Sequence, residues 1–222
     1  MGSKVKSGNL YWLGRYTERV LITLRFLMDS YDRMIDDCEV DYAAFCAQMG
    51  IENVYTDSKD FCNRFLFDSG NPDSIMSSMR YAYDNAIVLR EVLTSEGLSY
   101  IQMAITSMER ASDSSSPLVE LQCVIDNILA FRGSCYEHMD DITRNIIRCG
   151  SSVERIDLSI RLKYQLSHLN HEVSMLLNRL YKTRLEANKD SLDHLVDAVL
   201  DSGTPSATSA QLLGWVESLF SL

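Results

Sequence analysis

Apolar side chains recur every three to four residues along most of the chain, which is the spacing of one face of an α-helix. The first segment shows the pattern most clearly, with apolar residues at Leu10, Leu13, Val20, Leu24, Leu27, Tyr31 and Ile35 and with Thr17 in the gap. This spacing predicts a helix over about residues 9–37. A second helical stretch is predicted over about residues 41–67, with a break near Gly50.

Prolines and glycines suggest where the next helices begin and break. Pro72 and Pro117 each follow a polar stretch, and proline suits the first turn of a helix because its missing N–H has no partner there. One helix is predicted from residue 74 to residue 105. A long helical region is predicted over about residues 118–187, with interruptions near Gly133 and Gly150.

The C-terminal part is predicted to hold two shorter helices joined by a linker. Residues 188–200 form the first of these helices, and residues 201–211 form the linker, whose Thr208 and Gln211 fit a capping box. The last amphipathic helix, over residues 212–220, either packs on its own domain or docks on a partner. No stretch has the pattern of a strand. The sequence therefore predicts an all-α fold, with residues 1–222 forming a single helical bundle of about six to eight helices.

Composition and charge narrow the classes of partner. The chain has 222 residues, of which 46% are hydrophobic, and its net charge is −10. This charge disfavours binding to nucleic acid or to an anionic membrane surface. The run of acidic residues between 36 and 73 is either a solvated face or a docking surface for a basic partner. No apolar run is long enough for a transmembrane helix.

The six cysteines indicate the cellular compartment. They are scattered through predicted helices without a CxxC pair, and the sequence shows no signal peptide. This pattern favours reduced, mostly buried thiols and a cytoplasmic protein.

An internal repeat is the most informative motif. "LGRYTERVLITLRF" from Leu13 aligns with "CGSSVERIDLSIRL" from Cys149, and the alignment pairs Gly14 with Gly150, Glu18 with Glu154, Arg19 with Arg155, and Arg25 with Arg161. Matching glycines, charges and apolar positions in one register indicate two equivalent helices.

Helix geometry places the glycine and the glutamate of each copy on one face. The glycine lets another helix backbone come close, so the glutamate falls in a tight contact zone and requires a partner such as an arginine of the facing helix. Two interpretations remain open. The charges either fix the register of the bundle, or they line a cleft and contact a ligand.

The repeat and two further stretches resemble the alpha-E domain family, a group of predicted helical proteins named for a Glu-Arg motif. "LYWLGRYTERV" resembles the family's start, and "FRGSCYEHMDDITRNIIRCGSSVERI" resembles its second Glu-Arg segment. "YDNAIVLREVLTSEGLSYIQ" has the family's recurring positions at Asn85, Arg90, Glu91, Ser95 and Glu96. The resemblance covers roughly residues 10–170. The second copy departs from the family pattern, since Gly150-Ser151 stands where relatives usually have Gly-Arg, which puts in doubt any anion site that needs every arginine.

The resemblance implies a function through a partner. Alpha-E proteins commonly accompany a circularly permuted ATP-grasp protein, and often a transglutaminase-like protein. This chain is therefore expected to be a non-catalytic partner of an ATP-grasp amide ligase, with ATP and Mg²⁺ bound only by the ligase and no cofactor or metal of its own. The candidate motif or cleft residues are Arg15, Glu18, Arg19, Arg25, Asn85, Arg90, Glu91, Glu154, Arg155 and Arg161.

Two alternatives belong to other classes. The chain could be an enzyme that performs acyl or aminoacyl transfer, or modifies a peptide, at a Glu/Arg cleft, or it could be a self-associating helical scaffold. The sequence has no GxxxxGK[ST], GxGxxG or GxSxG motif. His138 in "YEHMDD" is a weak candidate for acid–base chemistry, and His168 and Glu172 in "HLNHE" resemble a zinc motif only loosely. For both, a solvated or hydrogen-bonded helix face is the preferred interpretation.

Overall fold

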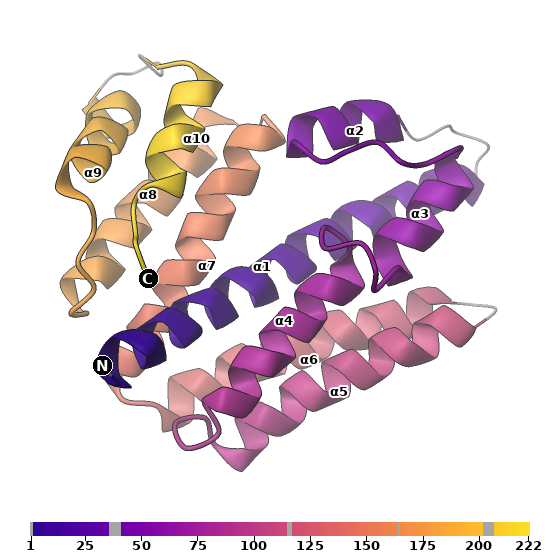
Figure 1. Cartoon of the computed structure of the whole chain (residues 1–222), viewed down its shortest axis with the longest axis horizontal. Helices are drawn as coiled ribbons and strands as arrows, with labels where there is room; N and C mark the ends of the chain where they lie inside the picture. The colour runs from indigo at the N-terminus through magenta and orange to yellow at the C-terminus, as the bar shows by residue number, and fades with distance from the viewer. Residues whose placement is uncertain (1, 36–40, 115–116, 164, 202–206) are drawn as a thin grey trace. The chain divides into compact units, whose positions relative to one another are not determined.

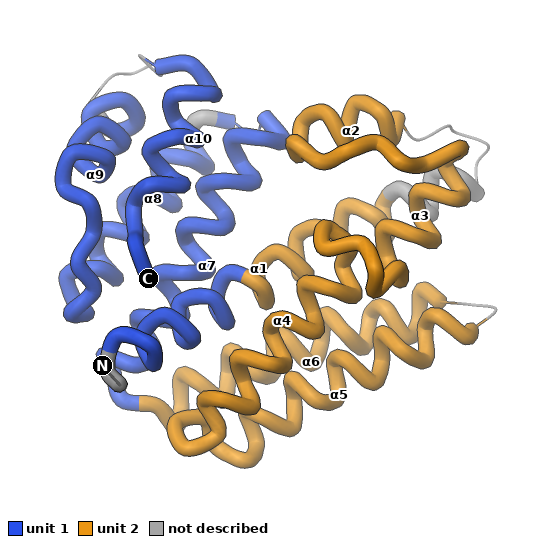
Figure 2. The backbone as a smooth tube through the Cα atoms, in the orientation of Figure 1, with its two compact units in different colours: residues 1–15, 140–222 blue, residues 16–139 orange. Residues whose placement is uncertain are grey.

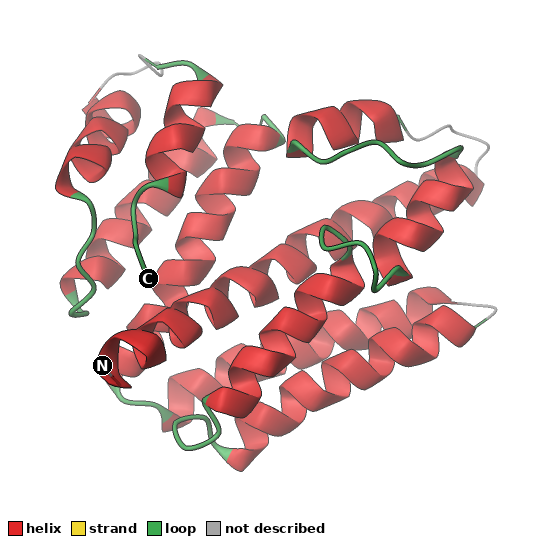
Figure 3. Ribbon diagram, viewed as in Figure 1, coloured by secondary structure: helices red, strands yellow, loops and turns green. Residues whose placement is uncertain are grey.

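The chain is all-α, as the pattern predicts. The computed structural model describes residues 2–35, 41–114, 117–163, 165–201 and 207–222, and in these residues it has ten α-helices and no strand (Figure 3). Ten helices exceed the six to eight predicted, because the predicted regions over 74–105 and 118–187 are divided into two and three helices.

Contacts between residues divide the chain into two compact units (Figure 2). The first unit comprises residues 1–15 and 140–222, and the second comprises residues 16–139. The first helix, α1 (Gly2–Ile35), contributes residues to both units. It begins earlier than predicted, and Asp36 and Asp37 lie outside the described residues. The organisation as a single domain stays a prediction.

The second unit holds the middle of the chain. Its further helices are labelled in Figure 1 and are α2 (Tyr42–Met49), α3 (Ser58–Phe67), α4 (Ile75–Val88), α5 (Ser95–Asp113) and α6 (Pro117–His138). Helix α5 packs along α6 and against α4, and α3 packs against α4. Aromatic rings fill the core beside α3. The ring of Phe45 lies 4.5 Å from that of Phe26 and 5.4 Å from that of Phe65, measured between centroids.

The first unit is built around α7 (Asp141–Arg161). Helix α8 (Leu166–Tyr181) and α10 (Ser209–Glu217) both pack on α7, and α10 also packs on α9 (Lys189–Val196), which continues into a short π-helical turn. The last helix buries Leu212 and Val216 in this unit, and Leu219 just after the helix is buried with them. Of the two roles left open for the terminal helix, the structure therefore has it packed on its own unit.

The described helices include none that is both long enough and apolar enough to cross a lipid bilayer.

Several predicted helix ends are confirmed. Gly50 ends α2 with a φ of 70°, a left-handed conformation that glycine adopts without steric cost. Pro117 opens α6. Thr208 and Gln211 form the reciprocal hydrogen bonds of a capping box at the start of α10.

Two other predicted helix boundaries are wrong, because a side-chain cap begins the helix at a different residue. Pro72 lies in the loop before α4, because the Ser74 hydroxyl accepts the N–H of Ser77 at 3.0 Å and begins the helix there. The predicted helix over 74–105 is divided in two, because Thr94 accepts the N–H of Gly97 and begins α5.

The glycines Gly133 and Gly150 do not interrupt helices, contrary to the prediction. Both lie inside helices, and the chain breaks instead at Asp140, which caps α7, and after Arg161. A glycine within a helix lowers its stability only modestly, so helix packing can retain it there.

The cysteines agree with the predicted buried thiols. The five described cysteines carry free thiols, of which four are buried, and Cys38 lies outside the described residues. Burial raises the pKa of both Cys135 and Cys149 to about 12. At pH 8 we expect iodoacetamide to alkylate these two thiols on the order of a thousandfold more slowly in the native chain than in denaturant. Mass spectrometry of timed samples measures the rates, and equal rates in both conditions would contradict the burial.

Candidate functional site

The two repeat glycines lie where α1 crosses α7 within the first unit. A Cβ atom added to Gly14 would lie 1.9 Å from the carbonyl oxygen of Ile147, and one added to Gly150 would lie 2.0 Å from the carbonyl oxygen of Tyr11. Both distances are far shorter than any van der Waals contact. Each glycine is therefore required so that the two helix backbones can touch.

The crossing follows the internal repeat. Tyr11 and Ile147 occupy equivalent positions in the two copies, so each glycine packs on the carbonyl three residues before the other glycine. The Ser151 hydroxyl donates to the carbonyl oxygen of Gly14 at 3.2 Å and adds a polar contact at the crossing. The two copies thus form a nearly symmetric close contact between helices.

Glu154 lies one turn beyond this crossing and is 1% exposed. Its carboxylate accepts a hydrogen bond from Nε of Arg15 at 2.6 Å, and the Arg15 side chain is 11% exposed. The pair therefore joins α1 to α7 inside the first unit. A carboxylate and a guanidinium buried together neutralise each other, whereas either one alone would be strongly unfavourable in this environment.

The groups around Arg15 shift its pKa. Burial alone would lower the pKa of Arg15, but the charge and hydrogen bond of Glu154, together with Tyr11 and Asp157, hold the pKa above its ordinary value. The guanidinium also lies 5.3 Å from the ring centre of Trp12, within the range of a cation–π interaction. Burial raises the pKa of the neighbouring Tyr11 to about 12, which keeps that phenol neutral.

Glu18, the matching glutamate of the first copy, is also 1% exposed and belongs to the second unit. Its partner is Arg132 of α6, whose Nη2 forms an ion pair with the Glu18 carboxylate. The repeat position that corresponds to Arg15 is a serine, Ser151. The two glutamates are therefore neutralised in different ways, one by an arginine of the repeat itself and the other by an arginine of α6.

The second residues of the Glu-Arg pairs lie nearer the surface. Arg155 donates from Nη1 to Glu172 of α8 at 3.1 Å, and its side chain is one-third exposed. Arg19 is half-buried. Arg161 pairs with Asp157 at 2.8 Å and with Glu217 of α10 at 3.0 Å, whereas its equivalent Arg25 is exposed.

The other predicted residues lie apart from the buried pairs. Asn85 of α4 is half-buried and donates to its own helix, at the carbonyl oxygen of Tyr81. Arg90 and Glu91 are exposed in the turn between α4 and α5. The segment that resembles the family's middle part therefore presents two adjacent opposite charges to solvent.

The histidines show no sign of a metal site. His138 ends α6, is exposed, and lies 3.3 Å from a Glu96 carboxylate oxygen. Glu172, the possible ligand beside His168, is paired with Arg155. In the described ranges, no group of three or more His, Cys, Asp or Glu side chains is arranged to hold a metal ion.

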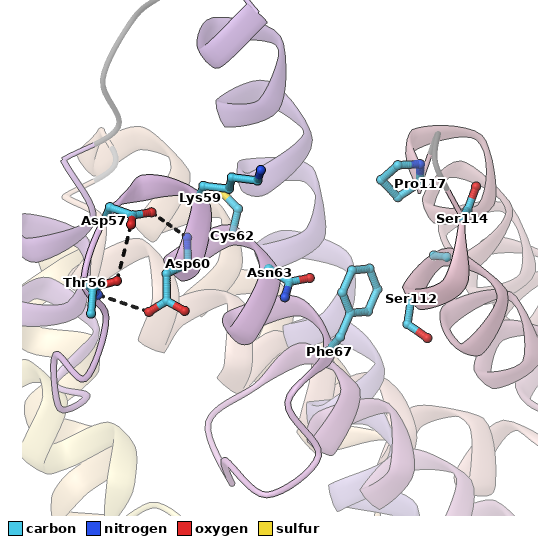
Figure 4. Close-up of a pocket in the computed structure, with 11 residues that line it drawn as sticks. Thr56, Asp57, Lys59, Asp60, Cys62, Asn63, Phe67, Ser112, Ser114 and Pro117 are labelled. Atoms are coloured by element: carbon cyan, nitrogen blue, oxygen red, sulfur yellow. Dashed lines mark hydrogen bonds between the residues drawn. The ribbon is translucent and has the colours of Figure 1, made fainter.

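Two surface hollows lie away from these residues. One, of about 540 Å³, is lined in part by Thr56, Asp57 and Asp60 at the start of α3 (Figure 4). There Asp57 accepts the N–H of Asp60 at 2.8 Å, and Asp60 accepts the N–H of Thr56 at 3.1 Å, so helix capping already uses these carboxylates. The other, of about 690 Å³, is lined in part by Trp12 and Arg184 of the first unit. Neither hollow includes a predicted site residue.

Sequence reasoning missed one member of the buried pairs. Arg132 is separated from Glu18 by a long stretch of chain, and no local spacing connects them. Its only signal is its place in "FRGS", at the start of a stretch that resembles the family. A third Glu-Arg pair, Glu109-Arg110, is exposed on α5. The glutamate of this dipeptide is therefore buried in both copies of the repeat but not in Glu109-Arg110.

Residues 1–205 match the model of the Alpha-E family, which is described as a predicted alpha-helical domain with a conserved ER motif. No curated protein and no solved structure matches the chain.

Proposed function

The chain belongs to the Alpha-E family, and from this premise we propose that it is a non-catalytic helical partner of an ATP-grasp amide ligase. The observation that carries the proposal is the burial of Glu18 and Glu154, each 1% exposed and each tied to an arginine. Carboxylates held in this way stabilise helix packing.

The alternative of an enzyme acting through the Glu/Arg pairs is less well supported. General acid–base or nucleophilic work requires a carboxylate within hydrogen-bond reach of the reacting group. One carboxylate oxygen of Glu154 already pairs with the buried Arg15, and one of Glu18 pairs with the part-exposed Arg132. The ligase as partner comes from the family resemblance, and the burial of the motif favours a role through the protein's surface.

The turn between α4 and α5 is the part of the family pattern that is open to a partner. Arg90 and Glu91 are exposed there, and Val88 just before them is 65% exposed. An exposed apolar side chain beside two opposite charges is a feature of many protein interfaces. We propose that this turn contributes to ligase binding.

The test is to purify the ATP-grasp protein from the native host, mix it with this chain, and measure the affinity calorimetrically. Replacing both Arg90 and Glu91 with alanine is expected to weaken binding by about tenfold, which is ~1.4 kcal/mol. The melting temperature should stay unchanged, because both side chains are exposed.

The matched control replaces Glu109 and Arg110 with alanine, since these are also adjacent, exposed and oppositely charged. The control is expected to keep the wild-type affinity. Absence of a complex between the wild-type proteins would contradict the proposed partner. Amide-bond turnover by this chain alone would contradict the non-catalytic role.

A further inference from the structure

Helix α8 packs on α7 in the first unit (Figure 1). Three arginines, Arg148, Arg155 and Arg179, cluster at this contact. Arg148, Ser152 and Arg155 lie on one face of α7, at intervals of four and three residues, while Glu172 and Arg179 lie two turns apart on α8. Glu172 pairs with Arg155, whereas no carboxylate of the described residues pairs with Arg148 or Arg179, so these two positive charges are uncompensated.

Arg179 is the least satisfied member of the cluster. It is 8% exposed, and its guanidinium donates to the carbonyl oxygen of Arg148 and to the hydroxyl of Ser152, both of which are uncharged. Its Nε atom is buried without a hydrogen-bond partner. Among the described residues no carboxylate forms an ion pair with Arg179 or Arg148. A buried guanidinium without a counter-charge is unfavourable unless an anion completes the site.

The carboxylate of Glu172 does not neutralise the cluster. Glu172 gives one oxygen to Arg155, and its Oε2 atom is buried without a hydrogen-bond partner. Burial, followed by repulsion from Arg148, lowers the pKa of Arg179 to about 10. The arginine therefore still carries its charge at neutral pH, in a field of like charges.

We propose that Arg148, Arg155 and Arg179 form a binding site for a phosphate group, with Ser152 and Glu172 holding the arginines in place. A phosphate carries a charge of about −1.5 to −2 at neutral pH, close to the uncompensated charge of the cluster, whereas a carboxylate carries only −1. Guanidinium groups suit it further, because their N–H donors pair with phosphate oxygens in parallel hydrogen bonds. Arg148 and Arg155 are part-exposed, so the group reaches the cluster from solvent. This site is independent of the proposed ligase partner.

The probe is inorganic phosphate, titrated calorimetrically into the full chain at pH 7.5 and constant ionic strength. We expect a dissociation constant on the order of 1 mM or tighter, and binding of acetate at least about tenfold weaker. Phosphate, compared with chloride, should also raise the melting temperature of the wild-type chain, a readout that needs no variant.

Arg148→Gln is the test variant, because Arg148 is part-exposed and its loss leaves the Arg155–Glu172 pair intact. We expect it to weaken phosphate binding at least about fivefold. Arg110→Gln removes the same charge from the exposed face of α5 and should leave binding within about twofold of wild type.

Methyl phosphate distinguishes two sources of the group. Binding of the monoester at least as tight as that of free phosphate assigns the site to a phosphorylated organic molecule, and binding of inorganic phosphate alone assigns it to the free ion. The proposal is overturned if phosphate neither binds nor stabilises the wild-type chain, if acetate binds equally well, or if Arg148→Gln and Arg110→Gln behave alike.

Discussion

Replacing Glu154 with glutamine is expected to lower the free energy of unfolding by about 3–5 kcal/mol, because the change leaves the buried Arg15 guanidinium without its counter-charge. The carboxylate is 1% exposed and lies 2.6 Å from Nε of Arg15. Glutamine has nearly the same shape, so little of the loss can come from packing. Urea unfolding followed by circular dichroism measures the effect, with a lower midpoint and an unchanged slope expected.

Glu217→Gln is the matched control for this substitution. Glu217 also pairs with an arginine, Arg161, at 3.0 Å, but its side chain is 60% exposed. An exposed ion pair contributes about 0–1 kcal/mol, so this variant should unfold almost as the wild type does. Equal effects of Glu154→Gln and Glu217→Gln would mean that burial of the repeat glutamate has no energetic importance.

Gly150→Ala should be the other strongly destabilising substitution, with a loss of about 3 kcal/mol. The added Cβ atom would lie 2.0 Å from the carbonyl oxygen of Tyr11 and 3.1 Å from the backbone nitrogen of Arg15, so α1 and α7 would have to separate. The clash is with backbone atoms, which no side-chain rotation can relieve. Thermal and urea unfolding measure the loss.

Gly214→Ala provides the control for the glycine, because Gly214 also lies inside a helix of the first unit and an added Cβ atom would meet nothing within 4 Å. Alanine favours the helix over glycine by about 0.8–1 kcal/mol, so this variant should be more stable than the wild type. If Gly150→Ala is stabilising too, the close approach of α1 and α7 at this glycine is wrong.

Features that depend on a few neighbouring residues predict much of the fold. The helix period indicates the all-α class, and the turn chemistry of Gly50 and Thr208 places two helix ends, because each depends on only a few neighbouring residues. The internal repeat pairs Gly14 with Gly150 from the residue order alone. Glycine is required at both positions, since each glycine packs on the backbone of the other helix.

The failures arise where distant residues decide the outcome. Gly150 has the local signature of a helix breaker, yet packing against α1 keeps it inside α7. Arg132 pairs with Glu18 across a long stretch of chain, and local spacing contains no trace of such a contact. The missing arginine at Ser151 points to an incomplete repeat but not to the residue that supplies the partner of Glu18.

The two repeat glutamates pair with arginines from different parts of the chain, and both pairs bear on the role of the motif. Glu154 takes its arginine from the other copy of the repeat, and Glu18 takes its arginine from α6. A catalytic pair would require carboxylates open to a substrate, whereas both of these are enclosed. The motif that defines the family is thus best explained as a packing element.

The most direct test of this account is a double-mutant cycle between Arg15 and Glu154, using Arg15→Leu, Glu154→Leu and the double variant in urea unfolding. A packing role predicts that each single variant loses about 3–5 kcal/mol and that the double variant is more stable than either, which corresponds to a coupling energy of about 3 kcal/mol or more. Additive losses, with a coupling energy below about 0.5 kcal/mol, would contradict the claim that the buried pair holds α1 against α7.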